Sequence, residues 1–246
     1  MQDYFKKRPI FAQDSITISK LTTCDIYIIF VMSKEKIDKI HVVFDLGGVV
    51  FRLDKSIAIA RFKQIGVTHV EEFLDDYAQK GIFGDLEAGL LTAEQYRDEL
   101  SRLTGKQLTM EELEYAWTGY AAELYQRNFD ALLRLRHEGY PAALLSNTNP
   151  FMMRWARSNE FDGNGHGLDY YFDRLYLSYE MRMMKPSAEI FKAMIDGERT
   201  SPDNILFIDD SARNCEAAAA LGIKTLNPAN GSDWRTDVFS IVGLTV

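Results

Sequence analysis

Short apolar segments alternate with amphipathic segments from Lys39 onward, and this alternation is the feature that most constrains the fold. Strands are predicted at residues 40–46, 141–148, 173–178, 204–210 and 223–227. Helices are predicted at residues 128–139, 187–197 and 212–222, with Asn128 as the N-cap of the first and Gly139 as its C-terminal stop. Such alternation is typical of a parallel sheet covered on both faces. We therefore predict an α/β fold with a Rossmann-like parallel sheet core and helices on both faces.

The segment from residue 56 to residue 127 lacks this strand pattern. Helices are predicted in it at residues 57–66, 70–81, 92–105 and 110–125. Because the segment stands between the first and second predicted strands, we expect an inserted helical cap domain, 56–127. The core domain would then be formed by residues 39–55 and 128–246, and the cap would lie over one edge of its sheet.

Residues 1–38 differ in composition from the rest of the chain. Their apolar stretch, residues 26–32, is shorter than the ~18 residues that a membrane span needs. No small-residue cleavage site of the kind that ends a signal peptide follows it. We predict that residues 1–38 are a poorly ordered N-terminal extension and that Met32 is the natural start.

The charge and cysteine content restrict the partners and the compartment. A formal net charge of -8 and a pI near 5.1 disfavour nucleic acid or an anionic membrane as partner, because both would repel this surface. The two cysteines, Cys24 and Cys215, are too few for a disulfide framework. We expect a cytoplasmic protein, either a monomer or a homodimer, that binds a small molecule.

Polar side chains follow the predicted strands, and the carboxyl ends of parallel strands form the edge where ligands bind. The candidates are Asp45, Ser146, Ser178 with the nearby Lys185, and the pair Asp209 and Asp210. Converging carboxylates repel one another unless a cation neutralises them, and an all-oxygen set suits Mg²⁺. The lysine, the serine and the backbone N–H groups at the Gly47 and Asn147 turns would add an anion cradle. His166, in the loop "DGNGHG", is predicted to be a solvated loop histidine.

These residues lie in four motifs that resemble those of the haloacid dehalogenase-like (HAD) hydrolases. The motifs are "VFDLGGV", "LLSNTN", "MKPSAEIF" and "FIDDSARNCEAAAALG", in the family's order. Within the family, "DLEAGLLTAEQY" is similar to an E-x-G cap segment with Glu87 and Gly89, and the chain resembles the bacterial α-D-glucose-1-phosphate phosphatase branch. Arg182 stands where that branch often has glycine.

The resemblance implies a phosphatase for a small phosphorylated metabolite such as a sugar 1-phosphate. Asp45 would be the nucleophile that forms an aspartyl-phosphate, with Ser146 and Lys185 as further catalytic residues. Leu46, Asn147 and Glu87 would bind substrate or phosphate. Mg²⁺ would be held by four residues: Asp45, Gly47 through its carbonyl, Asp209 and Asp210.

Gly47 stands where most phosphatases of the family place a second aspartate, the general acid and base. Three interpretations remain open. The leaving group needs little protonation, as in a sugar 1-phosphate or an acyl phosphate; or Asp54 or Glu87 transfers the proton; or the protein binds phosphate without catalysis. A haloacid dehalogenase is a further alternative, because those enzymes also use a lone aspartate here, but the acid pair Asp209 and Asp210 favours a metal and hence phosphate.

Overall fold

The computed structural model describes residues 39–75 and 79–245 of the chain, and Lys39–Val246 forms one compact unit. The predicted N-terminal extension, the predicted start at Met32 and Cys24 lie outside the described residues. Within the described residues, no helix combines the length and the apolar character that crossing a membrane requires.

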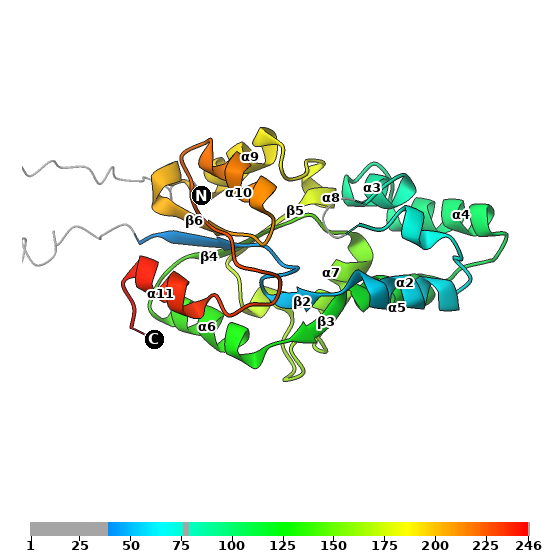
Figure 1. Ribbon diagram of the computed structural model, residues 1–246, viewed down its shortest axis with the longest axis horizontal. Helices are drawn as coiled ribbons and strands as arrows, with labels where there is room; N and C mark the ends of the chain where they lie inside the picture. Colours follow the sequence, from blue (N-terminus) through cyan, green and yellow to red (C-terminus); the bar gives the residue numbers. More distant parts are fainter. Residues whose placement is uncertain (1–38, 76–78, 246) are drawn as a thin grey trace, which may run out of the picture. The chain divides into compact units, whose positions relative to one another are not determined.

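A parallel sheet forms the centre of this unit, as predicted (Figure 1). In the described residues its strands are β1 (His41–Phe44), β4 (Ala142–Ser146), β5 (Arg174–Leu177), β6 (Ile205–Ile208) and β7 (Lys224–Leu226). Their order is β5-β4-β1-β6-β7, and every neighbouring pair is parallel. Buried, β-branched and aliphatic residues fill the central strands because both faces of the sheet are covered.

The strand order reverses next to β1. The chain runs from β1 outward to β4 and β5, and then returns to β6 on the other side of β1. Val43 of β1 accordingly pairs with both Ala143 and Phe207. Such a reversal opens a crevice at the carboxyl ends of the two strands, which is where open α/β sheets bind ligands.

Helices cover the two faces of the sheet (Figure 1). On one face lie α9 (Ala188–Glu198) and α10 (Ala212–Ala219), and on the other lie α6 (Gln126–His137) and α11 (Arg235–Val242). Successive strand residues point to opposite faces. Val43 therefore packs in the apolar cluster with Phe191, whereas Phe44 packs in the other cluster, where its ring lies 5.0 Å from that of Trp234.

The inserted segment leaves and re-enters the core through a pair of antiparallel strands, β2 (Phe51–Leu53) and β3 (Ala121–Leu124). Between them lie α2 (Lys55–Gln64), α3 (Ile82–Glu87), α4 (Ala93–Thr104) and α5 (Met110–Trp117), and the described residues between β2 and β3 are called the cap below. Its interior is aromatic: the ring of Phe83 lies 5.3 Å from Phe62 and from Tyr96, and 5.6 Å from Trp117. Each fully buried ring contributes about 1.5–3 kcal/mol by leaving water.

Two helix predictions in the cap are wrong. Of the predicted helix 70–81, the described residues form only the 3₁₀ turn η2 (Val70–Glu72). The Gln79 side chain bonds the backbone N–H and C=O of Asp75. The predicted helix 110–125 ends at Trp117, because a 3₁₀ turn, η3 (Thr118–Tyr120), leads into β3, whose pairing with β2 outweighs helix propensity.

Asn128 is not the N-cap of its helix. The helix α6 begins two residues earlier, with Tyr125 at the cap position. The Asn128 side chain is fully buried and donates hydrogen bonds to the backbone oxygens of Val49 and Val50, each at 3.1 Å. It thus ties α6 to the turn that follows Asp45. Gly139 does follow the end of the helix, with the positive φ of +79° that favours glycine.

Candidate active site

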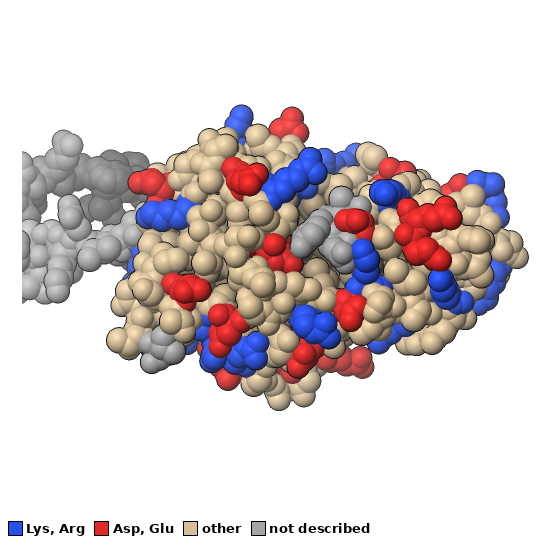
Figure 2. All heavy atoms as spheres, viewed as in Figure 1, with Lys and Arg blue, Asp and Glu red and all other residues tan. Residues whose placement is uncertain are grey.

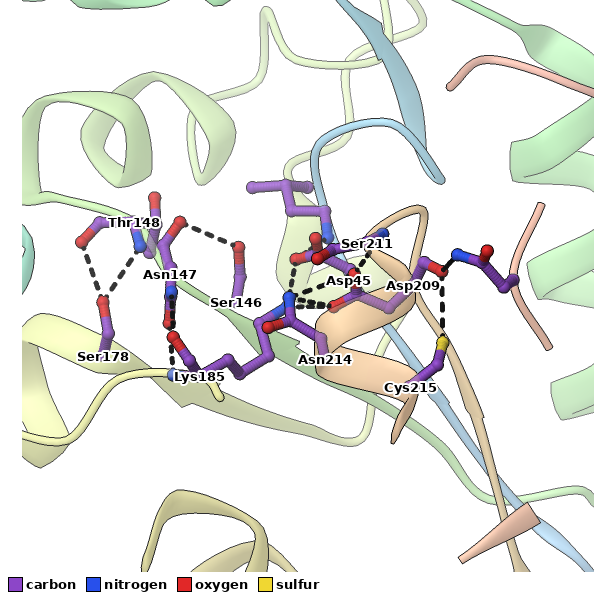
Figure 3. Close-up of polar contacts among 12 residues, drawn as sticks. Asp45, Ser146, Asn147, Thr148, Ser178, Lys185, Asp209, Ser211, Asn214 and Cys215 are labelled. Carbon is purple, nitrogen blue, oxygen red and sulfur yellow. Dashed lines mark hydrogen bonds and ion pairs between the residues drawn. The ribbon is translucent and has the colours of Figure 1, made fainter. Parts of the chain in front are cut away.

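The Lys185 ammonium joins two of the predicted site carboxylates at the crevice beside β1 and β6. Its Nζ lies 2.9 Å from Asp45 Oδ1 and 2.6 Å from Asp209 Oδ2 (Figure 3). Lys185 is buried, which lowers its pKa, but the carboxylates of Asp209 and Asp45 outweigh burial and raise it. Lys185 therefore keeps its positive charge. This charge can attract an anion to the site although the protein as a whole is negatively charged.

The Asp45 carboxylate is oriented by its own loop. Its Oδ1 accepts a hydrogen bond from the backbone N–H of Leu46 at 2.7 Å in addition to the contact with Lys185. Burial raises the pKa of Asp45 to about 6; Lys185 opposes this rise and Asp209 adds to it. The carboxylate is thus mostly ionised at neutral pH, as a nucleophile must be.

Asp45, Asp209 and Asp210 form a cluster in which one oxygen of each lies within 4.8 Å of the others. One lysine cannot neutralise three carboxylates, and no side chain of the described residues donates a hydrogen bond to Asp210. Burial and the neighbouring Asp45 and Asp209 raise the pKa of Asp210 to about 7. A divalent cation with oxygen ligands supplies the charge that this donor set lacks, so the residues fit Mg²⁺.

Asp209 has the least freedom of the three acids. Its oxygens accept hydrogen bonds from the backbone N–H of Ser211 at 2.8 Å and from Asn214 Nδ2 at 3.0 and 3.1 Å, besides the lysine (Figure 3). The side chain is fully buried. This full set of donors indicates that Asp209 mainly holds Lys185 in place, and that Asp210 is the more open of the two for a metal.

Ser146 and Asn147 follow β4 on the other side of the site. Ser146 is buried and lines the same pocket as Asp45 and Lys185. The Asn147 side chain is occupied: it donates to the backbone oxygen of Lys185 at 2.9 Å and accepts from its backbone N–H at 2.8 Å (Figure 3). Any contact of Asn147 with phosphate would therefore come from its backbone N–H, while its side chain fixes the lysine loop.

Glu87 reaches the site from the cap. It ends α3, is 5% exposed, and lines the pocket together with Asp45. Its backbone oxygen accepts a hydrogen bond of 2.7 Å from Ser178 Oγ, which also bonds the backbone of Thr148. Ser178 is fully buried and acts as a link between cap and core instead of facing the pocket.

The environment of Glu87 disfavours its charge. Burial raises the pKa of Glu87 to about 8, a hydrogen bond from the Asn149 side chain opposes the rise, and the charge of Asp45 adds to it. Asn149 is the N-cap of α7 (Pro150–Ala156), where its Oδ1 accepts from the backbone N–H groups of Phe151 and Met152. The Nδ2 amide thus remains for Glu87. The sequence Asn149-Pro150 is a helix-start signal that could have revealed this residue.

Gly47 has no positive φ; the constraint on it is space. A Cβ built on Gly47 would lie 2.9 Å from both methyl groups of Leu53, a residue of β2. The neighbouring Gly48 is more strictly required, since it has a φ of +78° and its Cβ would lie 2.1 Å from Asp210 Oδ2. The Leu53 side chain would therefore have to shift to admit an aspartate side chain at position 47.

Three other predicted or noted residues have structural roles. Asp54 caps α2 by accepting hydrogen bonds from Ser56, which lower its pKa, and it does not line the pocket. His166 bonds the buried carboxylate of Asp162 at 2.9 Å and is 41% exposed, so it is anchored and only partly solvated. Arg182 adopts a left-handed conformation with a φ of 54°, which explains why glycine suits this position.

The pocket continues from Asp45 toward the cap. Its walls include side chains that sequence reasoning missed, because they come from loops and helix ends far apart in the chain: Phe51, Leu53, Gln79, Trp117, Tyr120, Thr148, Asn149, Met152 and Asn214. Among the described lining residues, Lys185 is the only lysine or arginine. The wall beyond the carboxylates is therefore built of amides, aromatic rings and apolar groups.

This fold and this site define the family. Residues 41–222 match the model of the haloacid dehalogenase-like hydrolases, and the chain belongs to that family. It is 43% identical over 202 residues to the D-ribitol-5-phosphate phosphatase of Bacteroides thetaiotaomicron, covering 82% of this chain and 98% of that one. These findings confirm the prediction of a phosphoric monoester hydrolase.

Solved structures agree with this assignment. A predicted HAD-like hydrolase from Porphyromonas gingivalis is 40% identical, with a TM-score of 0.79 over 85% of this chain and 100% of that one. A HAD family enzyme from Bacteroides thetaiotaomicron in complex with magnesium and inorganic phosphate is 38% identical, with a TM-score of 0.74 over 82% and 99%. That complex and the acidic cluster bear out the prediction of magnesium. The narrower resemblance to the glucose-1-phosphate branch stays a prediction.

Proposed function

We propose that this protein is a Mg²⁺-dependent phosphatase that hydrolyses the phosphate monoester of a small neutral polyol through an aspartyl-phosphate on Asp45. The observation that carries the proposal is the composition of one pocket. It holds an ionised carboxylate beside a buried lysine and an acidic cluster at one end, and uncharged amide and aromatic groups at the other.

The polar end of the pocket suits phosphoryl transfer. Asp45 would attack phosphorus, and the Lys185 ammonium and the Ser146 hydroxyl would bind the equatorial phosphoryl oxygens, whose charge grows in the transition state. Backbone N–H groups of Leu46 and Asn147 stand at the same turns as further donors. Asn147 and Asp209 keep the lysine in position through their contacts with its backbone and its ammonium.

The magnesium ligands we propose are the side chains of Asp45, Asp209 and Asp210 and the carbonyl of Gly47. When bound, the ion would neutralise the carboxylates and the phosphate and hold both in line. The contacts of Asp209 argue that Asp210 contributes the more direct bond. The chain's own lysine supplies the remaining positive charge.

The uncharged end of the pocket suits hydroxyl groups. Gln79 and Asn149 offer amides, and Trp117 and Tyr120 offer rings on which a carbon chain can pack. With no second lysine or arginine among the described lining residues, a second anionic group on the substrate would be desolvated without a partner. A relative that acts on D-ribitol 5-phosphate by its name fits this reasoning. We therefore favour alditol phosphates, and keep the predicted sugar 1-phosphates as the second candidate.

The alternatives from the sequence have less support. The L-2-haloacid dehalogenase RSc1362 shares the fold with a TM-score of 0.52 but only 19% identity. In a dehalogenase without a metal, the carboxylates of the acidic cluster would repel one another without a cation to neutralise them. A binding protein without catalysis would not need an oriented, ionised Asp45.

A phosphate-release screen tests the proposal. Wild-type protein is assayed with D-ribitol 5-phosphate, α-D-glucose 1-phosphate and fructose 1,6-bisphosphate, in Mg²⁺ and in EDTA, with Asp45→Asn as the control. We expect the highest kcat/KM with the alditol phosphate, a clear loss with the bisphosphate, and no turnover in EDTA or with the variant. Full activity in EDTA, or preference for the bisphosphate, would contradict the proposal.

A further inference from the structure

We propose that the Glu87 carboxyl, from the cap, is the general acid that protonates the leaving oxygen, in place of the aspartate that Gly47 lacks. This inference rests on the proposed phosphatase function and adds a catalytic residue to it.

The first argument is the content of the pocket. Its described lining residues include three carboxyl groups, those of Asp45, Asp210 and Glu87. Asp45 is the nucleophile, and Asp210 belongs to the metal cluster. Glu87 is thus the one carboxyl of the described lining residues that is left for proton transfer, and it comes from the cap.

The second argument is that Glu87 is held in place from two directions. Ser178 Oγ fixes the backbone oxygen of Glu87 to the core at 2.7 Å, and the Asn149 side chain lies close enough to the Glu87 carboxyl group to lower its pKa. Close packing continues beyond the helix, since a Cβ on Gly89 would lie 2.2 Å from the backbone oxygen of Tyr179. A catalytic acid needs such fixed placement, because its proton must meet one particular oxygen.

The third argument is the protonation state. A general acid must carry its proton when the substrate binds, and burial raises the pKa of the Glu87 carboxyl to about 8, which favours its protonated form. The other acid considered from the sequence, Asp54, is exposed at a helix cap, where hydrogen bonds from Ser56 stabilise its ionised form. The environment of Asp54 therefore suits the N-cap of a helix and not a general acid.

The fourth argument is the leaving group. An alditol 5-phosphate releases a primary alcohol, which leaves very poorly as an alkoxide. Gly47 offers no carboxyl group, and a Cβ at that position would lie 2.9 Å from the methyl groups of Leu53. The proton has to come from elsewhere, and among the described residues that line the pocket Glu87 is the carboxyl group without another assigned role.

The two steps then balance. An Asp45 oxygen bonds to phosphorus while the bond from phosphorus to the ester oxygen breaks; its electron pair stays on that oxygen, which takes the Glu87 proton and leaves as a neutral alcohol. Water then attacks phosphorus and gives a proton to the Glu87 carboxylate, and the bond to Asp45 breaks. Phosphate leaves, and Asp45 and Glu87 return to their starting states.

The test compares leaving groups. Wild type, Glu87→Gln and the control Asp54→Asn are assayed with D-ribitol 5-phosphate and p-nitrophenyl phosphate, and kcat/KM is measured because it reports only steps up to loss of the leaving group. General acid help is worth about 10²–10⁴-fold. We expect Glu87→Gln to lose about 100-fold or more on the alkyl ester and less than about 10-fold on the aryl ester, whose nitrophenolate needs no proton. Asp54→Asn should match wild type on both.

Wild type alone gives an independent reading, should the variant fail to fold. A general acid makes kcat/KM depend weakly on the leaving-group pKa across a series of alkyl and aryl phosphates; a steep fall toward alkyl esters would overturn the inference. Equal losses of Glu87→Gln on both esters, or no loss, would also overturn it and leave the phosphatase function standing. A wild type inactive on every ester would refute both.

Discussion

Replacing Glu87 by Gln should stabilise this protein at alkaline pH. The pKa of Glu87 is raised from 4.5 to about 8 in the folded protein, chiefly by burial. Below pH 4.5 the carboxyl is neutral in both the folded and the unfolded state, so the substitution changes little there. Between these two values the unfolded state ionises while the folded state stays protonated, and the free energy of unfolding falls as pH rises.

The magnitude follows from the size of the interval. The interval spans about 3.5 pH units, and each unit corresponds to about 1.4 kcal/mol. The free energy of unfolding of wild type therefore falls by up to about 5 kcal/mol by pH 8. Gln keeps the shape of the side chain and cannot ionise. The neighbouring titratable groups, Asp45 and Tyr96, are present in both proteins, and the difference between the two curves therefore isolates Glu87.

The assay is urea unfolding in EDTA from pH 5 to pH 9, followed by circular dichroism. We expect equal free energies of unfolding near pH 5 and a difference in favour of Glu87→Gln that grows toward pH 8 and then levels off. Asp54→Asn is a suitable control, and it should not change how the free energy of unfolding depends on pH. Gln79→Glu is not suitable because it adds a charge. Parallel curves for wild type and Glu87→Gln would refute the claim that the carboxyl is held neutral.

Three further outcomes are expected. Asp210→Asn should raise the Mg²⁺ concentration needed for half-maximal phosphate release and be partly rescued by excess Mg²⁺, and an unchanged Mg²⁺ titration would exclude Asp210 as a ligand. Gly47→Asp should cost about 1–3 kcal/mol of stability, measured by urea titration, through overpacking against Leu53. Adding Leu53→Ala should recover much of that cost, and no recovery would mean that Leu53 is not the obstacle. Asn128→Ala should cost about 2 kcal/mol, because the carbonyl of Val50 loses its side-chain donor and that of Val49 keeps only the Trp234 indole N–H, and a variant as stable as wild type would contradict this.

The sheet and the polar end of the site could be predicted from the sequence for the same physical reason. Parallel strands bring their carboxyl ends to one edge, so Asp45, Ser146 and Asp210 converge there, and Lys185 joins them from the loop that follows β5 and α8 (Ser178–Met181). Figure 2 shows acidic and basic side chains interspersed over the visible face of the molecule. The charge composition alone therefore could not reveal where the site lies.

The cap side of the site could not be predicted in the same way. The contacts of Leu53 with the Gly47 turn and of Ser178 with Glu87 join segments that no periodicity relates. β3 was predicted as helix because residues 110–125 carry helix-forming side chains, whereas the partner strand β2 that decides its conformation lies almost 70 positions earlier in the chain. Asn128 was predicted to be an N-cap because its amide side chain can form hydrogen bonds with backbone groups. The same property lets it bond the backbone of a distant turn instead.

The pairing of β2 with β3 also affects how such a protein can change over evolutionary time. Phe51 and Leu124 are partners in this ribbon, so the two ends of the inserted segment lie side by side. Closing a loop between adjacent ends costs entropy that grows only slowly with loop length. The segment between the two strands can therefore be exchanged for a longer, shorter or differently shaped one while the sheet, Lys185 and the acids of the core keep their positions. Because Glu87 lies in that segment, such an exchange would change the proposed proton donor together with the substrate range.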